Sequence, residues 1–171
     1  RGLAFVHPFD NADVMAGQGT MALEILEQTP GVEAVVVPVG GGGLIAGIGT
    51  VMKARAPHVE VVGVEPEAAA SLAAAMAAGT PVDVPLAPTL ADGLAVSRVG
   101  DIPFASDRRV VDRVVTVDEA SIALAILRLI ELEKSVVEGA GASPRVALGA
   151  RRLSEKKGRK LWRTPRGGTH N

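Results

Sequence analysis

Four consecutive glycines, at residues 40–43, separate the apolar run AVVVPV from a second apolar run that begins at Leu44. Ordering glycine is entropically costly, so four in a row are expected where the backbone must approach a bound group closely. With a strand before them and a helix after them, backbone N–H groups and the helix dipole would favour an anion here. The glycine run therefore predicts a phosphate site, and a tight turn that binds nothing is the other interpretation.

The residues around the glycines restrict which phosphate could bind. In a Walker-type loop, Lys followed by Ser or Thr comes directly after the last glycine. Here the last glycine is followed by the apolar run that begins at Leu44. Gly41, Gly43 and Ala46 satisfy the dinucleotide pattern G-x-G-x-x-A, and Glu65 lies where such a site places its ribose-binding acid. A Rossmann-type dinucleotide-binding module is therefore an open alternative.

Composition excludes several classes of protein. The chain has 171 residues, a net charge of −1 and no cysteine, so disulfides, thiolate metal sites and a cysteine nucleophile are excluded. The small net charge provides no field that would recruit nucleic acid, and no apolar run reaches the length of a membrane span. The first residues lack a signal-peptide layout. We expect a cytoplasmic protein with no nucleic-acid or membrane partner.

Apolar periodicity and end signals predict helices that alternate with strands. The expected helices are 14–28, 44–56, 66–79 and 118–135, and the expected strands are 32–39, 59–65 and one within 109–117. Asp118 would cap the last helix, and Asp10, Asn11 or Asp13 the first. This order indicates an α/β fold with a parallel sheet and flanking helices.

Five stretches, in this order, resemble the threonine ammonia-lyase and serine racemase group of fold type II pyridoxal-phosphate enzymes, which is related to tryptophan synthase β. The stretches are FVHPFDNADVMAGQGTMALEIL, VVVPVGGGGLIAGI, VVGVEPE, LADGLAVSRVGDIPF and VDEASIALAILRLIELEKSVVEGAGA. ADGLAV followed by GDIPF is more similar to threonine ammonia-lyases than to serine racemases. The resemblance implies that residues 1–142 are the C-terminal part of such a catalytic domain, with its N-terminal portion missing.

The resemblance also implies a set of residues that bind the cofactor. Gly40, Gly41, Gly42 and Gly43, with Leu44 at the start of the helix, would hold the phosphate of pyridoxal 5′-phosphate. Gly93, in ADGLA, matches a position whose backbone lies close to the cofactor ring. Glu138, in VVEGAGA, matches a carboxylate near the edge of the ring, and a helix-end acid with a local partner is the other interpretation.

A cation site known in some members of the family matches less well. Glu65 corresponds to its first ligand, and Ala69 would offer a backbone carbonyl. The third ligand in the family is acidic, whereas this chain has Ser71. The substitution argues against a divalent cation, and an acid that ends a strand is the simpler interpretation of Glu65.

The lysine that forms a Schiff base with the cofactor lies, in this family, in an SFK-type motif upstream of the matching region. None of the five lysines has that context; they are Lys53, Lys134, Lys156, Lys157 and Lys160. We therefore expect no catalytic lysine in this chain and no activity from the chain alone.

Residues 143–171 depart from the resemblance and are expected to form a divergent, poorly ordered basic tail, in which a helix could cover 144–157. The family continues with an alanine-rich helix and a valine-rich strand that ends in CGGN or SGGN. This chain has RGGTHN, with Arg166 where the family places a neutral Cys or Ser against the cofactor ring. The abrupt change to basic composition suggests a reading-frame shift after about Ala142, and loss of the strand.

The resemblance implies that the full-length enzyme deaminates L-threonine, and L-serine as a second substrate, to 2-oxobutanoate or pyruvate and ammonia. Its partner would be a small amino acid, and the enzyme would be a homo-oligomer. A serine racemase-like activity and a non-catalytic remnant are further alternatives.

Overall fold

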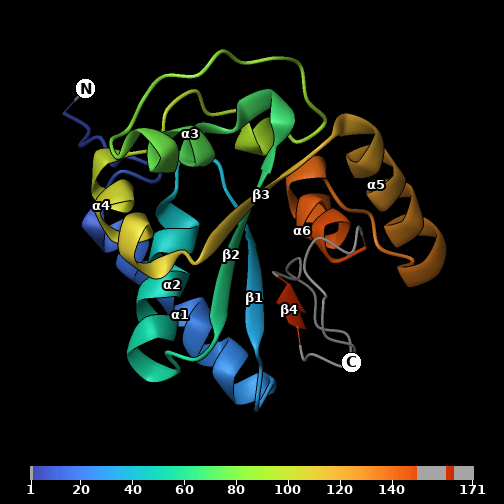
Figure 1. Cartoon of the computed structure of the whole chain (residues 1–171), viewed down its shortest axis with the longest axis horizontal. Coiled ribbons are helices and arrows are strands. Elements are labelled where there is room, and N and C mark those ends of the chain that lie inside the picture. The colour runs from blue at the N-terminus through green and yellow to red at the C-terminus, as the bar shows by residue number, and fades with distance from the viewer. Residues whose placement is uncertain (1, 150–160, 164–171) are drawn as a thin grey trace.

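The computed structural model describes residues 2–149 and 161–163, which form one parallel sheet with helices on both faces (Figure 1). The strands are β1 (Ala34–Pro38), β2 (Glu60–Pro66), β3 (Arg113–Val117) and β4 (Leu161–Arg163). Their spatial order is β3-β2-β1-β4, and every neighbouring pair is parallel. The predicted α/β class with a parallel sheet is confirmed.

Two groups of helices cover the two faces of the sheet. The helices α1 (Ala12–Gln28), α2 (Gly43–Arg55), α3 (Ser71–Ala78) and α4 (Asp101–Val110) lie on one side, and α5 (Glu119–Glu133) and α6 (Gly139–Gly149) on the other (Figure 1). Successive side chains of a strand point to opposite faces. Val35 and Val37 accordingly join the core cluster of Ile45 and Ile48, whereas Val36 joins the cluster on the α6 face.

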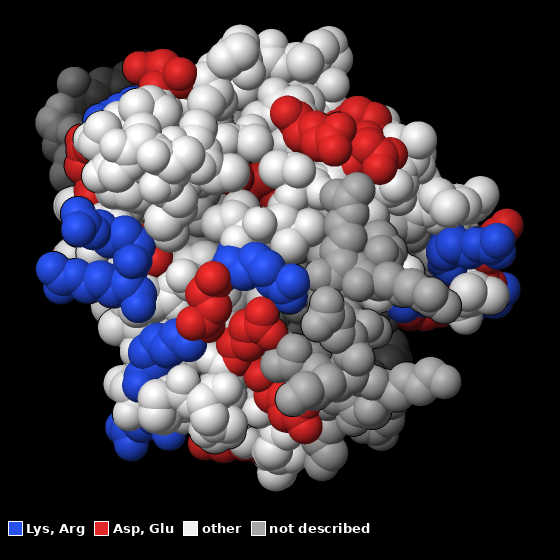
Figure 2. Space-filling view, viewed as in Figure 1, with Lys and Arg blue, Asp and Glu red and all other residues white. Residues whose placement is uncertain are grey.

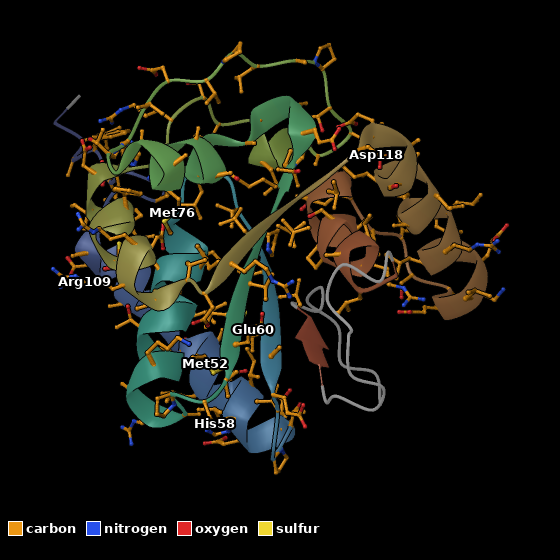
Figure 3. The ribbon with its side chains drawn as sticks, in the orientation of Figure 1. Met52, His58, Glu60, Met76, Arg109 and Asp118 are labelled. Carbon is orange, nitrogen blue, oxygen red and sulfur yellow. The ribbon has the colours of Figure 1, made fainter. Side chains whose placement is uncertain are left out.

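Two predicted helix caps are present. The Asn11 side chain accepts hydrogen bonds from the backbone N–H of Asp13 (2.9 Å) and Val14 (3.1 Å) at the start of α1. The Asp118 carboxylate accepts one from Ser121 N–H (2.8 Å) at the start of α5, where Figure 3 labels it. Each cap satisfies N–H groups that have no partner within the helix, which fixes where these helices begin.

The prediction of a single helix at 66–79 is wrong. The structure has a short 3-10 turn, η1 (Glu67–Ala69), and then the separate helix α3, with a break at Ala70 (φ −88°, ψ 59°). The Glu65 carboxylate accepts hydrogen bonds from the N–H groups of Leu72 (2.7 Å) and Ala73 (2.9 Å). These bonds give α3 its own capped N-terminus, which composition alone does not show.

The expected tail begins inside regular structure. Helix α6 crosses position 142, and its residues Pro144 and Ala147 are buried. Strand β4, which the sequence analysis did not expect, pairs with β1 in the register Ala34–Leu161. The expectation that the strand is lost is therefore wrong for residues 161–163. The rest of the tail, including Arg166, lies outside the described residues.

Charged side chains of both signs are intermixed on the face shown in Figure 2. The ion pairs of the described residues include Lys53–Asp112 (2.6 Å) and Arg113–Glu60 (3.1 Å). Within the described residues, no helix has the length and apolar character needed to span a membrane.

Candidate functional site

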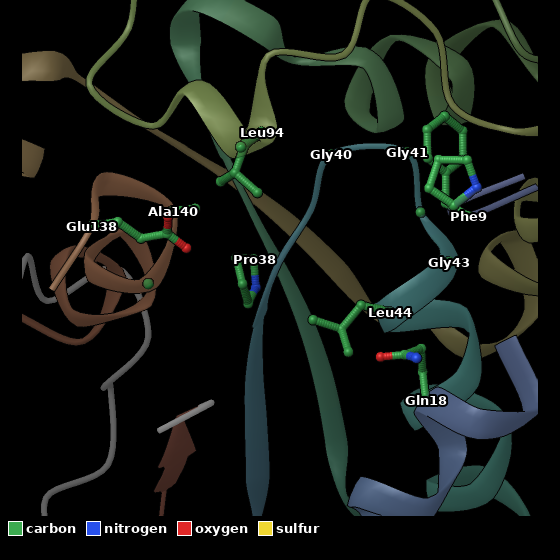
Figure 4. A pocket seen from close by; sticks show the side chains of 14 residues that line it. Phe9, Gln18, Pro38, Gly40, Gly41, Gly43, Leu44, Leu94, Glu138 and Ala140 are labelled. Atoms are coloured by element: carbon green, nitrogen blue, oxygen red, sulfur yellow. The ribbon is translucent and has the colours of Figure 1, made fainter. Parts of the chain in front are cut away.

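A pocket of about 660 Å³ lies where the chain leaves β1 and enters α2 (Figure 4). The residues that line it include all seven predicted cofactor-binding residues: Gly40, Gly41, Gly42, Gly43, Leu44, Gly93 and Glu138. They come from the turn after β1 with the first residues of α2, from the 3-10 turn η2 (Asp92–Leu94), and from the position just before α6. The pocket thus lies at the carboxyl end of a parallel strand, where ligands bind in open α/β sheets.

Residues 40–43 are here called the glycine turn, and three of them, at positions 41–43, have no room for a Cβ. A Cβ at Gly41 would overlap the ring of Phe9, and one at Gly43 would lie 2.9 Å from the Phe9 carbonyl oxygen. Gly42 is the N-cap of α2 and has φ +92°, a conformation that favours glycine. The backbone of the turn can therefore approach a bound group where any larger residue could not.

The backbone N–H groups of the glycine turn are available to a ligand. Within the described residues, no hydrogen bond uses the N–H of any of the four glycines as its donor. The carbonyl oxygen of Gly42 accepts the first helical bond of α2, from Ala46 (3.0 Å), and that of Gly41 accepts a bond from Gly100 (3.0 Å). The carbonyls are thus used by the fold, while the donors at the positive end of α2 remain open for an anion.

The sequence HPFD holds the outer side of the glycine turn. Nδ1 of His7 accepts hydrogen bonds from the N–H of Asp10 (2.8 Å) and Phe9 (3.4 Å). The Asp10 carboxylate in turn accepts from Ile102 N–H (2.9 Å) and Asp101 N–H (3.3 Å), which caps α4. Phe9 therefore rests against the glycines because a local turn and a distant helix both fix it.

Phe9 and Gln18 line the pocket, although the sequence analysis did not select them. Both lie in FVHPFDNADVMAGQG, one of the stretches that resemble the family. This resemblance is the only feature of the sequence that could have pointed to them. The signal does not reveal which of these residues reach the pocket, because that depends on how α1 packs against α2.

Glu138 lies across the pocket from the glycine turn in the view of Figure 4. Its side chain is exposed, and its carbonyl oxygen accepts a hydrogen bond from Ala142 N–H (3.0 Å) at the start of α6. Gly93 lies beside Ala140, and its N–H donates to the side chain of Asp92 (2.9 Å). The structure brings these residues to one pocket, and their role in binding the cofactor stays a prediction.

The predicted cation ligands do not belong to this pocket. In the described part of the chain, neither Glu65 nor Ala69 lines it, and no group of three or more His, Cys, Asp or Glu residues could hold a metal ion. Burial raises the pKa of the Glu65 carboxyl to about 7, against the lowering effect of the N–H groups of Leu72 and Ala73. A carboxylate that caps a helix accounts for these observations.

A second buried acid, Asp107, lies behind the glycine turn and was not selected from the sequence. It is 0% exposed, and neither carboxyl oxygen has a hydrogen-bond partner in the described part of the chain. Burial raises the pKa of its carboxyl to about 8, and the negative charge of Glu65 contributes to the increase. Its position in the polar segment DIPFASDRRV gave no sign of burial, because no helix was expected there.

Comparison with known proteins assigns the family. The family described as pyridoxal-phosphate dependent enzyme matches residues 1–160. The chain therefore belongs to this family, as the resemblance implied. It is 51% identical over 159 residues to the L-threonine ammonia-lyase of Geobacter sulfurreducens, covering 93% of this chain and 40% of the relative. It is also 51% identical over 141 residues to the L-threonine ammonia-lyase of Thermotoga maritima, covering 82% of this chain and 35% of the relative.

Solved structures agree with this assignment. The processed form of threonine deaminase isoform 2 from Solanum lycopersicum matches with a TM-score of 0.90 and 36% identity, over 95% of this chain and 48% of that chain. Maize serine racemase matches with a TM-score of 0.87 and 34% identity, over 95% of this chain and 50% of that chain. The chain thus spans about half the length of these two solved structures. It spans 40% and 35% of the length of the two curated relatives.

Proposed function

We propose that this chain is part of a threonine ammonia-lyase, which converts L-threonine to 2-oxobutanoate and ammonia and acts on L-serine to give pyruvate and ammonia. The observation that carries the proposal is the pocket at which residues from three separate segments meet, beside the open N–H groups of the glycine turn. Two relatives that are 51% identical have this name, and among the solved structures a threonine deaminase matches at 36% identity and a serine racemase at 34%.

The glycine turn would bind the phosphate of pyridoxal 5′-phosphate. Its N–H groups and the positive end of α2 suit a small dianion, and the absence of side chains allows close approach. Phe9 would restrict the turn on one side, and Gly93 and Glu138 would face the ring. When it is bound, the cofactor supplies the electron sink that the removal of an α-proton requires.

The chain alone would not complete the reaction. Lys53 is engaged by Asp112 (2.6 Å) and by the carbonyl oxygen of Val59 (3.0 Å), and Lys134 donates to the carbonyl oxygen of Glu131 (2.9 Å). Among the described residues that line the pocket there is no lysine. The part of the enzyme that is not in this chain would therefore supply the lysine that binds the cofactor covalently.

The test of the phosphate site uses pyridoxamine 5′-phosphate, which lacks the aldehyde and does not react with surface lysines. Calorimetric titration of the purified chain should show binding, and pyridoxamine without its phosphate should bind much more weakly. Gly41→Ala should abolish binding, because the new methyl group meets the Phe9 ring. Gly17→Ala is the matched control, since a Cβ there has no heavy atom within 4 Å.

Two outcomes would contradict the proposal. Binding of NAD without binding of pyridoxamine 5′-phosphate would favour the dinucleotide-binding alternative. Equal binding by the Gly41→Ala variant and the parent chain would show that the glycine turn is not the phosphate site. A keto-acid assay with L-threonine completes the test, and the isolated chain should form no 2-oxobutanoate.

A further inference from the structure

The carboxyl group of Asp107 touches the glycine turn from the side away from the pocket. A Cβ built on Gly42 would lie 2.7 Å from Oδ2 of Asp107, yet Asp107 is not among the described residues that line the pocket. The same point is 2.7 Å from Val99 and 3.0 Å from Pro103, so apolar side chains lie beside the carboxyl. A buried polar group without a partner in such surroundings calls for an explanation.

Among residues 2–149, no positively charged side chain is paired with Asp107. On β2, Glu65 faces it with a negative charge, and α3 contains no charged residue. The basic residues of α2, Lys53 and Arg55, lie in its last turn, at the end remote from Gly42.

On α4 itself, the basic residues Arg108 and Arg109 are exposed, and the acid Asp101 pairs with Arg98. Asp10 directs its carboxylate at the first N–H groups of α4. Within the described residues, Asp107 therefore forms no ion pair, and its ionised form would place an uncompensated charge next to Gly42, which lines the pocket.

We propose that Asp107 sets the affinity of the glycine turn for anions: its neutral form permits a phosphate group to bind, and its ionised form repels that group. This inference rests on the proposed function of the turn as a phosphate site. Two negative charges separated by a few ångströms of protein interact strongly, because the interior screens them far less than water does.

The direction of the pH effect follows from the pKa of about 8. Below this pH the carboxyl is neutral and binding is unhindered; above it the carboxyl ionises, so the affinity for the anion falls as pH rises. The coupling is reciprocal: an anion that binds better when Asp107 is neutral must raise the proton affinity of Asp107 by the same factor. We expect a factor of about ten, which corresponds to about one pKa unit.

The experiment measures the affinity for pyridoxamine 5′-phosphate at about pH 6.5 and about pH 9.5, on either side of this ionisation. The parent chain should lose about ten times more affinity across this range than Asp107→Asn, which has the same shape and no charge. Asp101→Asn is the matched control: it removes an exposed acid from the same helix and should behave as the parent does. The comparison cancels the ionisation of the ligand itself.

A second measurement needs no variant. In ¹³C NMR titrations of the parent chain, pyridoxamine 5′-phosphate should raise the midpoint of the Asp107 carboxyl by about one unit, whereas pyridoxamine should not. An unchanged midpoint, or equal pH profiles for the parent and Asp107→Asn, would overturn the role of Asp107 and leave the phosphate site intact. Absence of pyridoxamine 5′-phosphate binding at both pH values would overturn the phosphate site itself, and this inference with it.

Discussion

Glu65 and Asp107 are two fully buried acids with opposite surroundings. The carboxylate of Glu65 accepts two backbone hydrogen bonds, whereas that of Asp107 accepts none. Burial raises the pKa of both, and the hydrogen bonds limit the increase for Glu65 to about 7, compared with about 8 for Asp107. The two acids are thus equally buried, but the Glu65 carboxylate has hydrogen-bond donors and the Asp107 carboxyl has none among the described residues.

The different surroundings of the two acids suggest a structural role for Glu65 and a functional role for Asp107. Glu65 starts α3, so removing it should damage the fold. Among the described residues, the Asp107 carboxyl forms no hydrogen bond, so its cost in stability is unexplained unless it acts on the glycine turn that it touches.

The largest effect is expected for Glu65→Ala. The substitution leaves the buried N–H groups of Leu72 and Ala73 without an acceptor and opens a cavity, which together should lower the free energy of unfolding by about 3 kcal/mol. Urea unfolding at neutral pH measures this. Glu67→Ala removes an exposed acid two residues away and should change the free energy by less than about 0.5 kcal/mol. Similar losses for the two variants would show that Glu65 is not a cap.

The sequence predicts the regular parts of this region because their signals are local. The glycine turn, the valine-rich strands and the capping residues Asn11 and Asp118 lie next to the elements that they define. A resemblance that spans several motifs then identifies Gly93 and Glu138 as pocket residues, although neither has a local signal that would select it.

The parts that the sequence does not predict depend on contacts between distant residues. Asp10 caps α4 from about 90 residues away in the chain, so a polar segment with an internal proline becomes a helix. Strand β4 is short, and its pairing with β1 bridges more than 120 residues. From its polar segment, Asp107 would be taken for a surface acid. It is buried because α4 packs beside the glycine turn.

The second effect is a loss of stability with rising pH. Asp107 and Glu65 have higher pKa values in the folded chain than in the unfolded chain, so the folded state binds more protons between about pH 4 and pH 8. Stability should therefore fall across this window, by about 2 kcal/mol between about pH 7 and about pH 9 in urea unfolding of the parent chain. Asp107→Asn should lose clearly less over the same range, and parallel curves for the two proteins would refute the prediction.

The third effect concerns Gly42, which lies beside Asp107 and lines the pocket. Gly42→Ala should cost about 2 kcal/mol, because φ is +92° and the new Cβ would crowd Asp107 and Val99. Part of this cost should disappear in an Asp107→Ala background, since one of the crowded partners is then removed. Thermal unfolding of the two single variants and the double variant gives this coupling. Strict additivity would mean that Asp107 does not touch the turn.

The smallest effect is expected in the opposite direction. Asp107→Leu replaces an unsatisfied polar group by an apolar one of similar shape, so it should raise the free energy of unfolding by about 1 kcal/mol at pH 6. Asp101→Leu, on the exposed side of α4, should give no gain. A loss of stability in Asp107→Leu would mean that the carboxyl has a partner in the folded protein. A gain, combined with an anion affinity that no longer falls with pH, would mean that the protein retains this acid for its effect on the glycine turn and not for stability.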